Sequence, residues 1–280
     1  MTRVPTAARK PQDQAERPRE INFFAELPRA FAYPFHGRGK WIVLAGGGAF
    51  WFLGVLQDVL GGVGRAVVVM AMAIGVLTCG YLFAYVFRVI ASSADGEAEP
   101  PDWPDVLGAG GDFFDEMGRP ILLVLGTVVM SFLPLLIYVL AAAAAQGRIG
   151  DIAYYDFTGM FAPGWAWPWC RNMRTSLYYF GLAYLPMAML AMVLFDSVRA
   201  AHVGRVLAAI AKAPAHYLIV LAVLMGAAWA LPKLKALTAM VPVAGALADW
   251  VIGLYLYLFI PRLIGLLYAA NRRRLNWFGE

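Results

Sequence analysis

Residues Gly80–Leu125 read GYLFAYVFRVIASSADGEAEPPDWPDVLGAGGDFFDEMGRPILLVL, in which an acidic segment joins two apolar runs. Eight of the eighteen acidic residues of the chain fall within it: Asp95, Glu97, Glu99, Asp102, Asp105, Asp112, Asp115 and Glu116. The apolar runs on either side are too long and too apolar for ordinary soluble helices. The stretch therefore predicts membrane-spanning helices on both sides of a polar connection.

The composition of the whole chain supports this interpretation. Of its 280 residues, 61% are hydrophobic and 15% are charged, whereas soluble domains are about 45–50% apolar. Its Lys and Arg residues gather in the N-terminal tail and at the ends of the apolar runs, as the topology of any multi-pass membrane protein requires. We therefore expect the chain to contact the lipid bilayer and not to bind nucleic acid.

The apolar runs predict an all-α, polytopic membrane protein with six transmembrane helices. Their expected bounds are 41–56, 65–87, 119–145, 176–195, 214–231 and 246–267. Together they form one domain over residues 20–278. The basic tail before it, residues 1–19, lacks apolar periodicity and is expected to be disordered.

The distribution of positive charge predicts the orientation of these helices. Six crossings place both termini on one side of the membrane. That side holds 17 of the 23 Lys and Arg residues, and the opposite side holds 6. Because positively charged connections stay in the cytoplasm, we expect both termini, the tail and the acidic connection to be cytoplasmic.

A short amphipathic helix is expected after Trp103, inside the acidic connection. Asp102 can cap its first turn, and Pro104 is tolerated there because the backbone donors of a first turn have no helical partner. Its apolar residues recur at helical spacing, which leaves the acids largely on another face. Those surface acids are Asp105, Asp112, Asp115 and Glu116.

Two further surface helices are predicted. Residues 20–35 suit an interfacial helix, broken near Pro34, that leads the chain into the bilayer. Residues 196–213 suit a helix capped by Asp196 or Ser197. The basic residues on its polar side are Arg199, Arg205 and Lys212. One hypothesis is that this basic helix docks the acidic one; the alternative is that its cations bind lipid headgroups while the acids face water or a separate basic partner.

Three parts of the chain together resemble a known family. They are the P-x-W-x-D motif of Pro101–Asp105 after an aromatic span end, the segment FAELPRAFAYPF at Phe24–Phe35, and the C-terminal segment Arg262–Phe278. Over residues 21–278 the chain is similar to the prokaryotic membrane-protein family catalogued as domain of unknown function 4013. The resemblance implies six spans in the inner membrane of a prokaryotic cell, and it adds no catalytic residue.

Few side chains are candidates for chemistry. The histidines His36, His202 and His216 lie outside the spans or at their edges, without metal-binding spacing. Ionisable residues of the spans, Arg262 among them, are expected only near span ends, so no ion-coupling site is predicted. We therefore expect no catalytic, cofactor-binding or metal-binding residue and no enzyme activity. A membrane enzyme that acts on lipid is kept as an alternative, behind the two functions that follow.

The remaining functions are a scaffold and a transporter. The sequence favours a non-catalytic accessory, scaffold or regulatory component of a membrane complex, whose partner is another membrane protein or a second copy of the chain. The alternative is a transporter of small solutes or lipids with a pathway near Pro134 and Pro186, because Pro can break a span and open a site. Pro in a span more often only kinks it.

Overall fold

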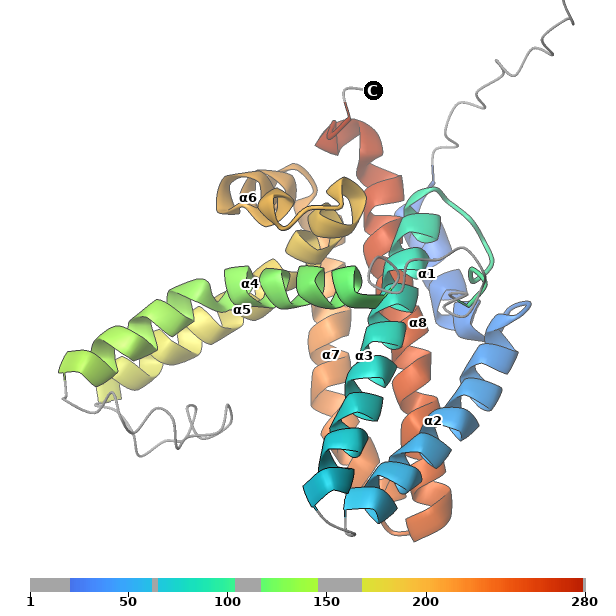
Figure 1. The fold of residues 1–280 in the computed structure, drawn as a ribbon. Helices are drawn as coiled ribbons and strands as arrows, with labels where there is room; N and C mark the ends of the chain where they lie inside the picture. The colour runs from blue at the N-terminus through green and yellow to red at the C-terminus, as the bar shows by residue number, and fades with distance from the viewer. Residues whose placement is uncertain (1–20, 62–64, 104–116, 146–167, 279–280) are drawn as a thin grey trace, which may run out of the picture.

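Residues 21–61, 65–103, 117–145 and 168–278 are described in a computed structural model of the chain. Nearly all of them are helical, and within these ranges six helices are long and apolar enough to cross a membrane (Figure 1). The six are α2 (Gly39–Gly61), α3 (Arg65–Ala94), α4 (Arg119–Ala145), α5 (Pro168–Phe195), α7 (Pro214–Thr238) and α8 (Pro242–Leu275). The predicted all-α fold with six long apolar helices is confirmed.

Short helices precede α2 and α7 in the chain. Helix α1 (Phe23–Ala32) begins where the Asn22 side chain accepts a hydrogen bond of 3.1 Å from the backbone of Phe24. The 3-10 helix η1 (Tyr33–Phe35) follows, so the predicted break near Pro34 is confirmed. The 3-10 helix η5 (Val198–Ala201) and α6 (Val203–Lys212) precede α7.

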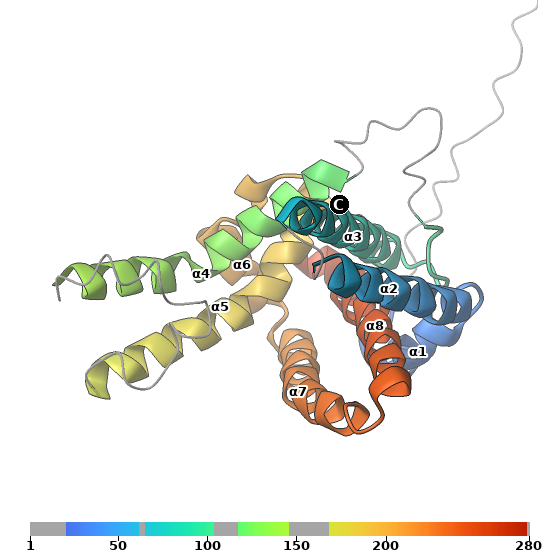
Figure 2. The same ribbon diagram turned by 60° about the horizontal axis from the view of Figure 1, so that its bottom comes forward.

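Helices α2, α3, α7 and α8 form a bundle in which α8 packs against the other three (Figures 1 and 2). Four leucines of α8 are fully buried in this core: Leu258, Leu263, Leu266 and Leu267. Helix α8 lies close to the backbone of α3 at Gly265, where an added Cβ would lie 2.6 Å from the carbonyl oxygen of Ile90. The α3–α8 crossing therefore depends on a residue without a side chain.

Helices α4 and α5 form a hairpin that projects sideways from the bundle (Figures 1 and 2). Between the two helices the Thr127 hydroxyl contacts the sulfur of Met192 at 2.6 Å, and Gly181 lies against the Phe132 ring. The six crossing-length helices therefore do not pack as one parallel bundle.

Contacts at the base of the hairpin hold it to the rest of the protein. Arg119 at the start of α4 forms an ion pair with Asp196, just after α5. The Tyr184 hydroxyl of α5 donates a hydrogen bond to the carbonyl of Ala201. These contacts fix the end of α5 against η5, while the remainder of the hairpin extends away.

The prediction of one helix over residues 196–213 is wrong. The chain forms η5 and α6, separated by His202 in an extended conformation. Because the Ala201 carbonyl accepts the Tyr184 hydroxyl, a tertiary contact replaces a helical hydrogen bond at this point. Ser197 caps η5, as predicted for this segment, and the His202 imidazole accepts from the backbone of Gly204 at 3.2 Å to cap α6.

Several predicted boundaries also differ from the structure, most of all at the start of α5 and at the end of α8. Helix α5 begins at Pro168 rather than at 176, because Pro is tolerated in a first helical turn. Helix α8 continues past 267 to Leu275 and ends at Asn276, which has a positive φ of 47°. Arginines occupy its last turn, where positive charge stabilises the helix dipole.

Candidate functional site

The described start of the acidic connection, residues 95–103, is bound to the end of the bundle through its backbone. The Arg262 guanidinium donates to the carbonyl of Glu97, and the Tyr33 hydroxyl donates to that of Glu99 at 3.4 Å. The Tyr85 hydroxyl donates to the carbonyl of Pro101 at 3.0 Å. Three donors, from α8, η1 and α3, therefore hold the backbone of the connection at every second residue between Glu97 and Pro101.

This attachment ends in an aromatic slot that holds Trp103. The Trp103 ring stacks on Tyr85 and Tyr81, with centroid distances of 5.0 and 5.3 Å, and lies 6.4 Å from the ring of Phe50. An added Cβ on Gly46 of α2 would lie 3.2 Å from the Trp103 ring. The predicted docking residue Trp103 is therefore an anchor for its own connection, between α2 and α3.

The hydroxyl of Tyr33 stays a hydrogen-bond donor at neutral pH. Burial raises the pKa of Tyr33, since the charged phenolate is poorly solvated there, although the nearby charge of Arg262 opposes this effect. The guanidinium of Arg262 lies 4.7 Å from the Tyr33 ring, in a cation–π contact. Tyr33 therefore helps to hold both the connection and the arginine.

The remaining residues of the predicted docking site are only partly described. The acids Asp105, Asp112, Asp115 and Glu116 lie outside the described residues. On the basic side, Arg199 is exposed, Arg205 lies 4.6 Å from the Phe195 ring, and Lys212 donates a hydrogen bond of 3.1 Å to the carbonyl of Leu275. Docking of the acidic segment by these cations stays a prediction.

The residues predicted for a transport pathway lie in the projecting hairpin. Pro134 is inside α4 and Pro186 is inside α5, and both helices continue without interruption past them. Pro186 is buried, and Pro134 is half-buried. The two prolines do not divide the helices into separate halves.

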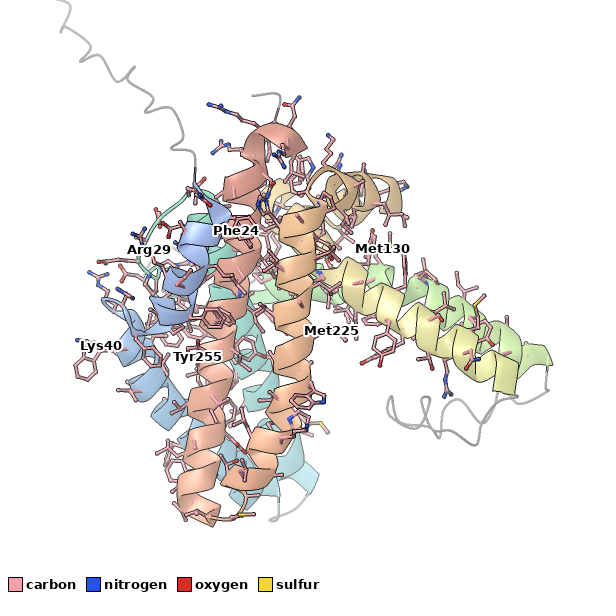
Figure 3. All side chains as sticks on the ribbon, turned by 180° about the vertical axis from the view of Figure 1, so that it is seen from behind. Phe24, Arg29, Lys40, Met130, Met225 and Tyr255 are labelled. Atoms are coloured by element: carbon pink, nitrogen blue, oxygen red, sulfur yellow. The ribbon has the colours of Figure 1, made fainter. Side chains whose placement is uncertain are left out.

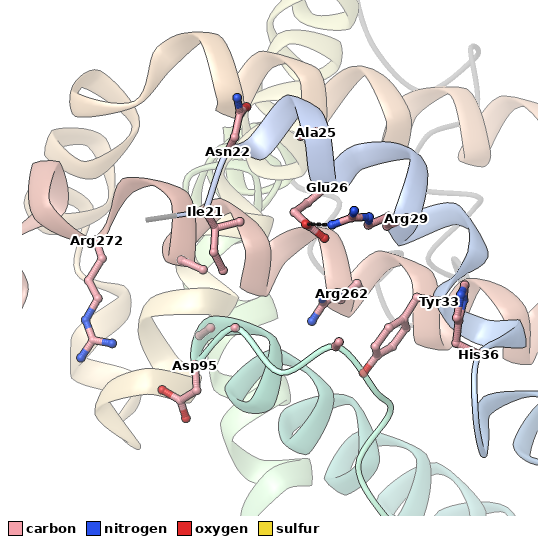
Figure 4. Close-up of a pocket in the computed structure, with 14 residues that line it drawn as sticks. Ile21, Asn22, Ala25, Glu26, Arg29, Tyr33, His36, Asp95, Arg262 and Arg272 are labelled. Carbon is pink, nitrogen blue, oxygen red and sulfur yellow. Dashed lines mark hydrogen bonds and ion pairs between the residues drawn. The ribbon is translucent and has the colours of Figure 1, made fainter. Parts of the chain in front are cut away.

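A pocket of about 570 Å³ lies beside the attached connection, between α1, η1, residues 94–98 and α8 (Figure 4). Its size falls in the range of small-molecule sites, roughly 300–1,000 Å³. Five charged side chains line it: Glu26, Arg29, Asp95, Arg262 and Arg272. Glu26 and Arg29 form an ion pair at 2.5 Å. A small polar or charged ligand could be held there.

Arg262 is the central charged group of this pocket. Its side chain is 4% exposed, and its Nε has no hydrogen-bond partner within the described part of the chain. Helix α8 continues past Arg262 to Leu275, and the expectation that this arginine lies near the end of a membrane span stays a prediction. The sequence signal that marks Arg262 as a buried charge is the run IPRLIGLLYAA, which is apolar on both sides of this arginine.

Comparison of the chain with protein families, curated proteins and solved structures finds no match. The resemblance to domain of unknown function 4013 therefore stays a prediction.

Proposed function

We propose that the protein is a non-catalytic accessory or scaffold component of a membrane complex and that its α4–α5 hairpin binds the partner. The observation that carries this proposal is the projection of the hairpin from the bundle (Figure 2). An arm attached to the rest of the chain mainly at its base can reach a neighbouring membrane protein while the bundle keeps its own packing.

The outward face of α4 supports this role. Large apolar side chains recur along it at helical spacing and are between 36% and 58% exposed: Leu122, Leu125, Val129, Leu133, Leu136, Ile137 and Leu140. The opposite face, with Leu123, Leu135 and Val139, is buried. In a bilayer, tight packing between apolar helices, rather than removal from water, drives their association. The exposed face of α4 offers such a surface to a partner helix.

Photo-crosslinking in membranes of the native host tests this proposal. A photoreactive phenylalanine analogue would replace Leu133 or Ile137, which are exposed on α4, with Leu135 as the matched buried control. A bound partner predicts discrete higher-mass adducts from Leu133 and Ile137 and none from Leu135. Co-expression of two differently tagged copies then separates a second copy of the chain from a different membrane protein.

Lipid is the competing occupant of this face. If only lipid covers α4, the analogue at Leu133 and Ile137 reacts with acyl chains and yields no discrete protein adduct. That result, obtained with normal abundance of both variants, would contradict the scaffold proposal.

A further inference from the structure

We propose that the pocket around Arg262 binds the phosphate group of a membrane phospholipid. The pocket lies at the end of the bundle where α1, η1 and the acidic connection meet (Figure 4). This inference is independent of the partner bound by the hairpin.

The first argument is the incomplete set of partners of Arg262. Burial of a charge is unfavourable unless the charge is paired and hydrogen-bonded. In the described residues Arg262 contacts the carbonyl of Glu97 and the ring of Tyr33, but it forms no ion pair with a carboxylate, and its Nε donates to nothing. A guanidinium presents several donors in one plane, and a phosphate oxygen is a strong acceptor for them.

The second argument is the charge of the pocket. Arg29 is neutralised by Glu26 at 2.5 Å. The three arginines and two acids that line the pocket leave a net charge of +1, with His36 taken as neutral. This excess favours one negative charge in the ligand. A phosphodiester carries a single negative charge, whereas inorganic phosphate at neutral pH is a mixture of the monoanion and the dianion, and Asp95 would repel the second charge of the dianion.

The third argument is the depth of the pocket relative to the bilayer. The outer surfaces of α1, η1 and the start of α2 carry aromatic side chains that are 46–65% exposed: Phe24, Phe31, Phe35 and Trp41. Trp gathers at the level of the lipid headgroups because its ring has an apolar and a polar part, and exposed Phe side chains of a surface helix insert at the boundary between headgroups and acyl chains. Figure 3 places Phe24, Arg29 and Lys40 along this end of the protein. The pocket therefore lies where phospholipid phosphates lie.

A purely structural role for Arg262 is the competing interpretation. In that case the guanidinium only fastens the carbonyl of Glu97 and the ring of Tyr33. Removal of Arg262 would then lower the thermal stability of the protein with or without phospholipid. A phosphate site instead predicts that the response to phospholipid depends on the arginines of the pocket.

The test uses the full chain, delipidated in a neutral detergent, with thermal unfolding as the readout. The probes are a short-chain phosphatidylglycerol, a diacylglycerol with the same acyl chains, and inorganic phosphate. We expect phosphatidylglycerol to raise Tm in a saturable manner, and the same concentration of diacylglycerol or inorganic phosphate to leave it unchanged. An equal response to inorganic phosphate would overturn the lipid assignment in favour of a soluble anion, and an equal response to diacylglycerol would overturn the phosphate site.

Two variants assign the response to the pocket. Arg272→Gln changes a lining residue that is less buried than Arg262, so this variant should fold. We expect it to weaken the apparent affinity for phosphatidylglycerol about tenfold, since one charge-assisted contact is lost. Arg262→Gln should abolish the response; if this variant is unfolded, the result for Arg272→Gln decides. The matched control is Arg273→Gln, an exposed arginine of the same turn that does not line the pocket. Equal affinity in Arg272→Gln and the parent would overturn the proposal.

Discussion

The hydroxyl of Tyr85 in α3 donates a hydrogen bond of 3.0 Å to the carbonyl of Pro101, and the ring of Tyr85 stacks on Trp103, two residues further along the chain. One side chain thus holds the acidic connection through its backbone and through an aromatic ring. The connection is therefore attached to the bundle up to Trp103.

Replacement of Trp103 tests this attachment. Trp103→Ala removes the ring from its contacts with Tyr81, Tyr85 and Phe50, and we expect a loss of about 2 kcal/mol because the side chain is only half-buried. Thermal unfolding in detergent measures the loss. Trp229→Ala is the control, because Trp229 is 69% exposed on α7. Equal effects of the two substitutions would show that the slot contributes nothing specific.

Gly46 should be coupled to Trp103. Gly46→Val places methyl groups where the Trp103 ring now lies, since even a Cβ would approach it to 3.2 Å. We expect Gly46→Val to be destabilising alone and to cost clearly less in the Trp103→Ala background, with a coupling of about 1 kcal/mol. Strict additivity of the two substitutions in a double-mutant cycle would contradict their contact.

The α3–α8 crossing predicts different outcomes at two glycines of one helix. Gly265→Ala should destabilise the protein by about 1–3 kcal/mol, because the methyl group would meet the backbone of α3. Gly253→Ala has nothing within 4 Å of its new methyl group, and helix propensity should make it neutral or stabilising by up to about 1 kcal/mol. The ratio of folded to unfolded protein in denaturant measures both. A tolerated Gly265→Ala would contradict the close crossing.

Much of the fold follows from the sequence, because span length and apolar composition are local properties. These local properties were enough to predict all six long helices and the break near Pro34. The separation of η5 from α6 could not be predicted in this way, since it depends on a contact from Tyr184, which is distant in sequence. The pocket was missed for the same reason: Arg262 meets Tyr33 and Glu97 only after segments distant in sequence have packed together. The projection of the hairpin is likewise a property of tertiary packing that helical periodicity does not contain.

Cysteine labelling tests the predicted orientation of the chain. In a background with Cys79 and Cys170 replaced, single cysteines at Ala15 and Asn276 should react with a membrane-impermeant reagent only from the cytoplasmic side. A cysteine at Gly159 should react only from the opposite side, because 17 of the 23 positive residues lie on the side of the termini. Labelling of Ala15 and Gly159 from one side would contradict the six-span topology.

Reversal of several charges tests the predicted docking of the acidic segment. Asp112, Asp115 and Glu116 would become Lys, and Arg199 and Arg205 would become Glu; Lys212 stays, because it holds the carbonyl of Leu275. Single exposed pairs contribute at most about 1 kcal/mol, so the changes are made together. We expect the combined variant to regain thermal stability at low salt and to lose this gain at high salt. Additive losses without rescue would leave the acids for an outside partner.

Crosslinking in a lipid bilayer can measure whether the α4–α5 hairpin stands away from the bundle. Figure 3 places Met130 on the hairpin and Met225 on α7. One variant carries cysteines at Met130 and Met225, and a second carries them at Tyr179 and Trp229. Both would be placed in nanodiscs and treated with a short bifunctional thiol reagent. The control pair replaces Phe132 and Tyr178, whose ring centroids lie 5.9 Å apart between α4 and α5. If the hairpin projects from the bundle, we expect crosslinks within one chain for the control pair alone. Crosslinks between the hairpin and α7 as efficient as the control would contradict this projection.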